Sequence, residues 1–213
     1  MGTPSSQVGS KVGVMADSHG QTACLQDALD FFERNGCNGI YHLGDICDSA
    51  HPQTAQRCVQ LLRQHQIIAI KGNNDHQVVV NHMHSPPAYI SVATIEFLKD
   101  LPLTLKVDDM VLAHSLPFVK QRGLSCMVGA LGENEADLFF RLYPRRILLR
   151  GHSHLPELMR LHNKTIINQG LTPGVTQQLA NIVPGIITCG AVDHGYVMIW
   201  DRREQAICSY KLK

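Results

Sequence analysis

The chain has little of what would place it in a membrane, outside the cell or on a nucleic-acid strand. Its 213 residues contain no apolar run near the ~18 residues of a membrane span, and its start lacks the basic and apolar stretches of a secretory signal. A formal net charge of +1 offers no basic face to nucleic acid or anionic lipid. The seven cysteines form no CxxC pair, which favours reduced thiols and a cytoplasmic protein.

Aromatic residues are also scarce, at 6% with a single tryptophan, but the hydrophobic content of 44% is that of an ordinary globular protein. A chain of this length can bury roughly 70% of its unfolded surface without disulfide or metal staples. We therefore expect a flexible leader over residues 1–10 and a single domain over residues 11–213.

Strands and helices alternate in the first third of the chain. Short apolar runs rich in Val and Ile predict strands, and apolar residues at helical spacing, such as 25, 28, 29 and 32, predict helices between them. The resulting order is βαβαβ, which favours parallel strands with right-handed crossovers. The predicted strands cover 11–16, 39–43 and 67–70, and the helices cover 22–34 and 54–64.

The pattern then changes to one dominated by strands. We expect helices only at 92–98 and 133–142, with hairpin turns at Asp108-Asp109, Asn163 and 193–195. This part predicts an antiparallel or mixed sheet packed on the first one. The predicted strands cover 103–107, 110–113, 146–149, 158–161, 165–168, 186–190, 196–200 and 206–210.

Four short polar strings follow apolar runs: Asp-Ser-His at 17–19, Gly-Asp at 44–45, Gly-Asn-Asn-Asp at 72–75 and Gly-His-Ser-His at 151–154, with His114 between the last two. In open α/β sheets, ligands bind beyond the carboxyl ends of the strands, so these strings are expected at one edge. The candidate ligands among them are two carboxylates, one carboxamide and four imidazoles, which are enough for two adjacent divalent cations.

Taken singly, the strings have ordinary explanations. An Asp-x-His tripeptide is usually a turn, Gly-Asp after a strand is usually a helix N-cap, and Gly-Asn-Asn-Asp passes as a plain turn. The ordered series, with each member at a strand end, makes chance an unattractive explanation.

The order DxH, GD, GNxD, H, GHxH resembles that of the calcineurin-like metallophosphoesterase superfamily, from Lys11 to about Asn168. The short length and the GNxD box without histidine resemble its small phosphodiesterase branch. The resemblance implies an α/β fold, a two-sheet mixed β-sandwich flanked by helices on both sides, with a dinuclear metal site.

The resemblance also implies the ligands, and Asp45 would bridge the two metals. Imidazole and carboxylate ligands suit Mn, Fe, Zn or Ni, and we expect Mn. Two such ions ~3.5–4 Å apart can acidify a bridging water and clamp phosphoryl oxygens during in-line attack. The first metal would be held by Asp17, His19, Asp45 and His154, and the second by Asp45, Asn73, His114 and His152.

Residue 74 departs from the phosphomonoesterase branches, where a histidine contacts substrate. Asn74 can bind a phosphoryl oxygen but cannot deliver a proton, so leaving-group protonation falls to Asp75, His76 or water. Asp75 is the catalytic candidate, but we favour the alternative that it orients a metal-bound histidine. We expect phosphodiester preference, because a diester carries one fewer charge than a monoester dianion.

Two other functions stay open: a phosphomonoesterase or protein phosphatase, and a non-catalytic scaffold such as the retromer subunit of this fold. The expected partner is a small or nucleotide-like phosphoester rather than extended nucleic acid or a membrane, and a homo-oligomer stays open. Residues 116–132, with Lys120 and Arg122, are either a solvated loop or a lid. His42 is expected to face a helix layer, and His194 to be an exposed turn residue.

Overall fold

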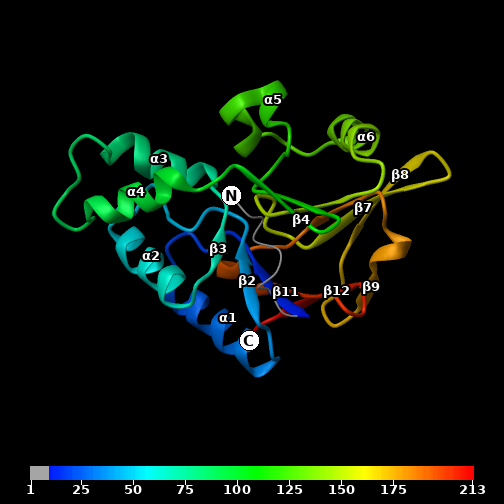
Figure 1. Ribbon diagram of the computed structural model, residues 1–213, viewed down its shortest axis with the longest axis horizontal. Coiled ribbons are helices and arrows are strands. Elements are labelled where there is room, and N and C mark those ends of the chain that lie inside the picture. The colour runs from blue at the N-terminus through cyan, green and yellow to red at the C-terminus, as the bar shows by residue number, and fades with distance from the viewer. Residues whose placement is uncertain (1–9) are drawn as a thin grey trace.

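The computed structural model describes residues 10–213, so residues 1–9 of the expected leader lie outside the described part. Two six-stranded mixed sheets face each other, with helices packed outside them (Figure 1). This is the two-sheet sandwich that the sequence predicts. Within residues 10–213, no helix is both long and apolar enough to cross a membrane.

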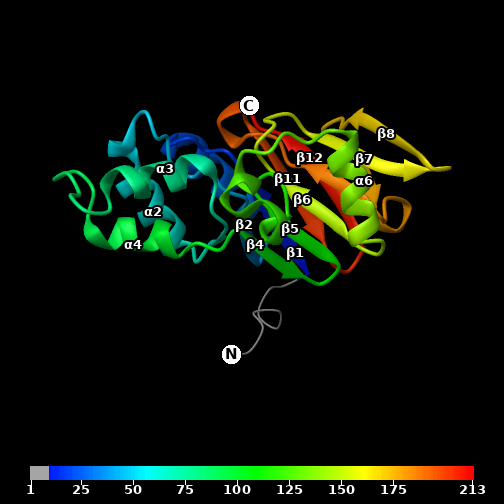
Figure 2. The ribbon, with the colours of Figure 1, turned by 90° about the horizontal axis from the view of Figure 1, so that it is seen from above.

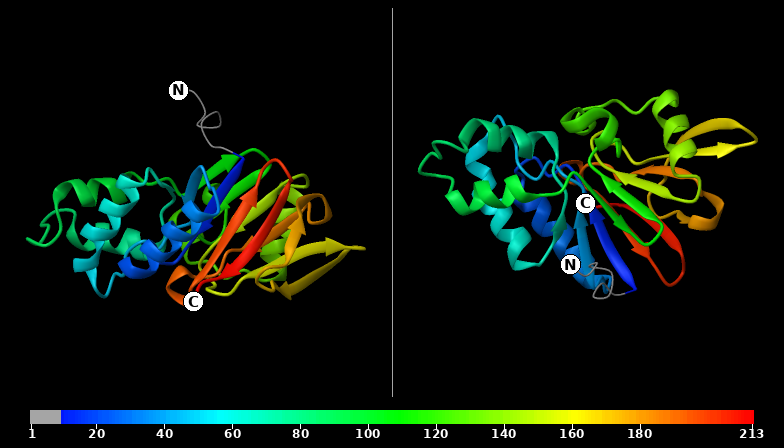
Figure 3. Two further views of the ribbon diagram at one scale, coloured as in Figure 1. Left: turned by 90° about the horizontal axis from the view of Figure 1, so that it is seen from below. Right: turned by 45° about the horizontal axis from the view of Figure 1, so that its top comes forward.

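The first sheet combines the opening strands with the end of the chain. Its three parallel strands β1, β2 and β3 carry the βαβαβ order, and β11 pairs antiparallel with β1. Figure 3 shows the red C-terminal strands beside the dark blue first strand. In spatial order the sheet contains β3 (Ile68–Ala69), β2 (Gly39–His42), β1 (Lys11–Met15), β11 (Tyr196–Asp201), β12 (Ala206–Lys211) and β9 (Thr176–Gln178).

The second sheet is built around three parallel strands, β5, β6 and β10, with antiparallel strands at both edges. The late strands are therefore shared between the sheets, rather than forming a sheet of their own. In spatial order it contains β4 (Thr104–Val107), β5 (Met110–Ala113), β6 (Ile147–Arg150), β10 (Gly185–Thr188), β7 (Glu157–His162) and β8 (Thr165–Gly170).

Helices cover both outer faces of the sandwich. In Figure 2, α2, α3 and α4 lie to one side of the strands, and α6 lies over the second sheet. The helices are α1 (Thr22–Arg34), α2 (Ala55–Gln64), α3 (Asn73–His82), α4 (Val92–Asp100), α5 (Val119–Arg122) and α6 (Glu133–Leu142), with 3-10 turns η2 (Pro52–Thr54), η3 (Gly123–Met127), η4 (Leu179–Asn181) and η5 (Val192–His194).

The apolar residues form three cores that correspond to these layers. Between the sheets, Val14, Leu112 and Trp200 belong to one buried cluster. Phe32 belongs to a second cluster with α1, α2 and α4, and Phe139 belongs to a third with α6 and the second sheet. Burial on both faces explains why the central strands are continuous apolar runs rather than alternating ones.

Helix α3 is absent from the sequence-based expectation. Its buried apolar residues are only Val78 and Val79, and the β-branched run 78–80 has low helix propensity. The backbone N–H of Gly72 donates to Asp75 Oδ2 at 2.9 Å, which fixes the first turn. Tertiary packing and this N-terminal contact outweigh propensity here.

Candidate metal centre

The four polar strings and His114 all follow the carboxyl ends of parallel strands, as expected. The register aligns Met15 with His42 in the first sheet and Ala113 with Arg150 in the second, so the following loops start level. Those loops are joined by backbone hydrogen bonds: Asp17 N–H donates to the Gly44 carbonyl at 3.0 Å. Strand pairing within each sheet and the packing of the two sheets together bring side chains that are up to 137 positions apart in the chain to one place.

The backbone at these loops is held in an unusual conformation. Five of the seven proposed ligands have positive φ, between 42° and 71°. Non-glycine residues rarely adopt this region, and such strain clusters at functional sites. The sharp reversals direct the side chains of neighbouring loops toward one another. The five are Asp17, His19, Asp45, His152 and His154.

Two glycines allow the loops to approach this closely. A Cβ on Gly72 would overlap the backbone and carboxylate of Asp45. A Cβ on Gly151 would lie 2.7 Å from Ala16 Cβ and from Asp17 Oδ2, across the boundary between the sheets. Glycine is required at these two positions because a Cβ would overlap neighbouring atoms, and not because a turn needs positive φ there.

One group of donor atoms surrounds His154. The Nε2 atoms of His19 and His154 face each other at 3.2 Å, and Asp17 Oδ1 lies 3.8 Å from His154 Nε2. These three residues present ligand atoms within 4.8 Å of one another.

A second group surrounds His114. His114 Nε2 lies 3.1 Å from Asn73 Oδ1 and 3.2 Å from His152 Nδ1. The other ring nitrogen, Nδ1, donates to the Leu43 carbonyl at 2.8 Å, which fixes the ring orientation. All three residues that were assigned to the second metal together with Asp45 are therefore in contact.

Asp45 lies between the two groups and presents one oxygen to each. Its Oδ2 is 4.0 Å from His19 Nε2, and its Oδ1 is 3.5 Å from His114 Nε2. Burial acts to raise the pKa of Asp45, but His114 and the hydrogen bonds from Asn74 outweigh it and hold this pKa well below its usual range. Asp45 is thus an anion that lies between the two groups of donor atoms.

The donor set fits divalent cations. Asp17 Oδ1 is buried without a hydrogen-bond partner among residues 10–213, and two pairs of imidazole nitrogens face each other. Burial acts to lower the pKa of His114, but Asp45 outweighs it and raises the value to about 9, which shows how strongly this cluster favours a cation. Bound metal would satisfy these atoms together.

Asn74 contacts Asp45 rather than open space. Its backbone N–H and its Nδ2 donate to the two oxygens of Asp45 at 2.8 and 2.7 Å, and its Oδ1 accepts from the Ser49 hydroxyl at 2.7 Å. In this arrangement its amide holds the Asp45 carboxylate in place, a role that the sequence-based assignment to substrate did not include.

Asp75 is placed unlike a catalytic acid. Its carboxylate is fully buried and accepts from the backbone N–H groups of Ile46, Cys47 and Gly72 at 2.9–3.0 Å. Burial raises its pKa to about 6, so it is ionised at neutral pH. The expected catalytic role finds no support in these contacts, because all three bonds fix the Asp45 loop and the start of α3. The orienting role that the sequence suggested also differs from the one observed, because Asp75 orients backbone N–H groups rather than a histidine ring.

Residues 116–132 contain α5 and η3, and hydrogen bonds and an ion pair hold them in place. Arg122 pairs with Glu135 of α6 at 2.8 Å, and the Leu116 N–H donates to the Cys126 carbonyl at 3.0 Å. Arg122 is therefore engaged with a carboxylate in this structure, and not with the metal-ligand cluster.

Three residues near the centre have contacts with it that the sequence analysis did not assign. His42 is buried and contacts the Ser18 hydroxyl at 3.0 Å. Ser18 lies in the sequence between the proposed ligands Asp17 and His19. Asp193 and His194, read as a hairpin turn, present ligand atoms within 4.8 Å of His154, and the rings of His154 and His194 are 5.4 Å apart. An Asp-His-Gly string carries no signal that separates this role from an ordinary turn.

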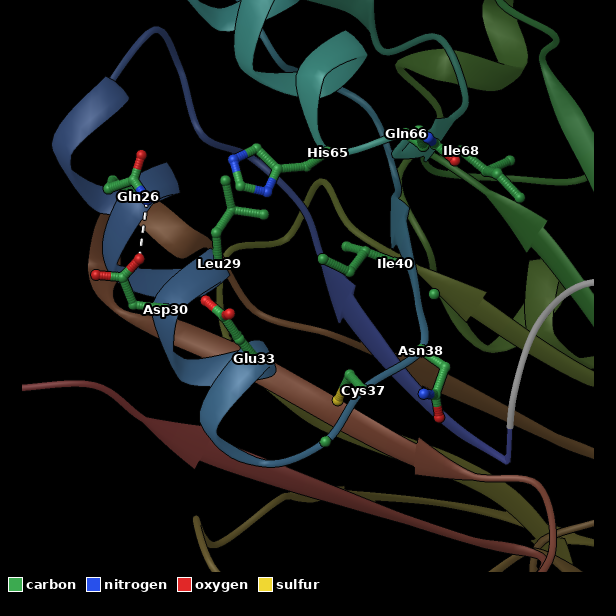
Figure 4. A pocket seen from close by; sticks show the side chains of 12 residues that line it. Gln26, Leu29, Asp30, Glu33, Cys37, Asn38, Ile40, His65, Gln66 and Ile68 are labelled. Atoms are coloured by element: carbon green, nitrogen blue, oxygen red, sulfur yellow. Dashed lines mark hydrogen bonds between the residues drawn. The ribbon is translucent and has the colours of Figure 1, made fainter.

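A separate pocket lies between α1 and the start of β2 (Figure 4). Its lining includes Asp30, Glu33 and Cys37 but none of the seven proposed ligands. Gln26 donates to Asp30 at 2.8 Å, the dashed line in Figure 4. Burial raises the pKa of Cys37 to about 11, so its thiol is protonated and unreactive at neutral pH. The pocket therefore offers no activated thiol.

Comparison with solved structures supports the fold. A metallophosphoesterase from Sphaerobacter thermophilus has 19% identity and a TM-score of 0.69 over 95% of this chain and 88% of its own. A putative diadenosine tetraphosphatase has 15% identity and a TM-score of 0.58, covering 95% and 93%. An archaeal phosphodiesterase has 13% identity and a TM-score of 0.53, covering 95% and 99%. At these identities the likeness concerns the fold alone.

A search of curated proteins found no significant match. The model of the calcineurin-like phosphoesterase superfamily domain matches residues 11–194, a span that includes all seven proposed ligands. On that match, together with the sandwich fold and the clustered donors, the chain belongs to the calcineurin-like phosphoesterase superfamily.

Proposed function

We propose that the chain is a metal-dependent phosphodiesterase that hydrolyses small or nucleotide-like phosphodiesters. The observation that carries this proposal is Asp45, which offers one oxygen to the His19 side and the other to the His114 side. A carboxylate in that position suits a pair of cations better than a single one.

The ligand assignment of the proposal has two sets that share Asp45. It is supported by the contacts within each set: His19 with His154 at 3.2 Å, and His114 with Asn73 and His152 at 3.1 and 3.2 Å. The superfamily uses a dinuclear site for divalent metals. When bound, such cations polarise phosphoryl oxygens and make water a better nucleophile. Manganese is the metal that we propose.

The preference for diesters rests on residue 74 and on charge. Asn74 brings an amide to Asp45 in place of an imidazole that could protonate a leaving group. Two carboxylates against two dications leave the centre about +2, which is enough for the single charge of a diester. The net charge of +1 over the whole chain supports a small substrate rather than a long nucleic acid.

The test compares hydrolysis of bis-p-nitrophenyl phosphate and p-nitrophenyl phosphate in Mn²⁺. We expect the diester to be hydrolysed faster than the monoester. In Asp45→Asn, kcat/KM for the diester should fall by at least about 100-fold, because that change removes the bridging charge. His65→Gln, at an exposed position, is the matched control. Faster monoester hydrolysis would favour the phosphomonoesterase alternative, and metal-free, inactive protein would favour the scaffold.

A further inference from the structure

The end of strand β6 carries a buried arginine that the metal-ligand set does not use. Arg150 is completely buried and directly precedes the Gly-His-Ser-His string. A buried guanidinium is costly unless its donors are satisfied, and its usual partner is a carboxylate. Here the partners of its N–H groups are neutral oxygens.

Those oxygens belong to three different segments. Arg150 Nε donates to the Ser115 carbonyl at 2.9 Å and Nη2 to the Ser115 hydroxyl at 3.0 Å. Nη1 donates to the hydroxyls of Ser153 at 2.7 Å and of Thr188 at 3.2 Å. The strands concerned, β5, β6 and β10, are neighbours in the second sheet, and Figure 2 shows β5 beside β6.

Two of these segments carry proposed metal ligands. Ser115 follows His114, and Ser153 lies between His152 and His154. Ser115 in turn donates from its hydroxyl to the Gly129 carbonyl, so the same contact extends to the segment before α6. One planar side chain thus fixes the distance between the loop of His114 and the loop of His152.

We propose that Arg150 is a positioning residue for the second metal: its guanidinium holds the His114 and His152 loops at the separation that this cation requires. The proposal rests on the two-metal function proposed above. Because Arg150 is fully buried, it acts through the loops and not on the substrate. The planar guanidinium holds its N–H donors in a fixed fork, and this geometry is essential. A lysine cannot replace it, because its ammonium is a point charge on a flexible chain.

The experiment measures Mn²⁺ binding by calorimetry and by electron paramagnetic resonance, independently of activity. Wild-type protein should bind two Mn²⁺ ions with the spectrum of a coupled pair. Arg150→Met and Arg150→Lys should both lose about 10- to 100-fold in affinity for one ion, the usual effect of removing a partner behind the ligands. Their spectrum should change to that of isolated Mn²⁺. Arg141→Met, the same exchange on the exposed side of α6, should behave as wild type.

Ser153→Ala covers the case in which an Arg150 variant does not fold. It removes one hydrogen bond at an exposed residue, so a loss of about 3- to 10-fold for one ion is expected. Two ions bound with wild-type affinity in Ser153→Ala or Arg150→Met would overturn the proposal. Full recovery in Arg150→Lys would overturn the role of the fork. Wild-type protein that binds no Mn²⁺ would refute the proposed function as well. Wild-type protein that binds two ions, together with Arg150 variants that also bind two ions with the same affinity, would refute the role of Arg150 alone.

Discussion

His42 should make the metal-free protein sensitive to mild acid. Its ring is fully buried, and Nε2–H donates to the Ser18 hydroxyl, which itself donates to the Ile46 carbonyl at 3.1 Å. The second nitrogen, Nδ1, is buried without a hydrogen-bond partner among residues 10–213. A proton added there would create an unpaired buried cation. Burial, reinforced by the nearby His114, accordingly lowers the pKa of His42 from 6.5 to about 3.

The sign and size follow from proton linkage. Between pH 6.5 and about pH 3 the unfolded chain binds a proton on this histidine and the folded chain does not. Stability therefore falls as the pH falls, by about 1.4 kcal/mol per pH unit from this one group, or about 2 kcal/mol at pH 5. His42→Gln removes the titration but keeps an amide able to donate to Ser18.

The assay is urea unfolding at pH 7.5 and pH 5 with EDTA present throughout. His42→Gln should lower the unfolding free energy at pH 7.5, because a buried ring is replaced by a shorter amide. This deficit should shrink by about 2 kcal/mol at pH 5, where wild type has lost that much more. His65→Gln, on an exposed histidine, should keep the wild-type acid dependence. A deficit for His42→Gln that is equal at both pH values would refute the reasoning.

Three further predictions concern the centre itself. Asn74→Ala removes an amide that holds the bridging carboxylate, so we expect a loss of about 10- to 100-fold in Mn²⁺ affinity by calorimetry, whereas Gln77→Ala on the same helix should leave it unchanged. Gly151→Ala should lower the unfolding free energy by about 1–3 kcal/mol, because the new Cβ would lie 2.7 Å from neighbouring atoms. In the control Gly170→Ala the new Cβ meets nothing within 4 Å, so the unfolding free energy should not change. Equal stabilities of the two variants would contradict the steric argument. Removing metal with EDTA should abolish hydrolysis and lower the melting temperature. Restoring Mn²⁺ to 100 times its Kd should return about 2.7 kcal/mol of unfolding free energy for each ion bound, and full activity in EDTA would exclude a metal-dependent reaction.

The sequence by itself predicted the side chains that gather at the candidate centre. Polar strings after apolar runs are a local signal, and parallel strands of one sheet place their ends at one edge, so the grouping of Asp17 with Asp45 could be expected without coordinates. His114 follows a strand of the other sheet, and the packing of the two sheets brings it to them. The same local signals gave the βαβαβ opening and the two helices that pack on it. Each depends on spacing within a short window, which a sequence displays directly.

Only the tertiary structure decided which group does what around the ligands. Asp75 resembles an acid in the sequence, but the fold surrounds it with three backbone N–H groups. Arg150 and His42 look like strand residues, and most of their hydrogen-bond partners lie 24 to 38 positions away. The sharing of late strands between two sheets has the same origin. Hydrogen-bond partners and burial depend on contacts between distant segments, and no periodicity along the chain encodes them.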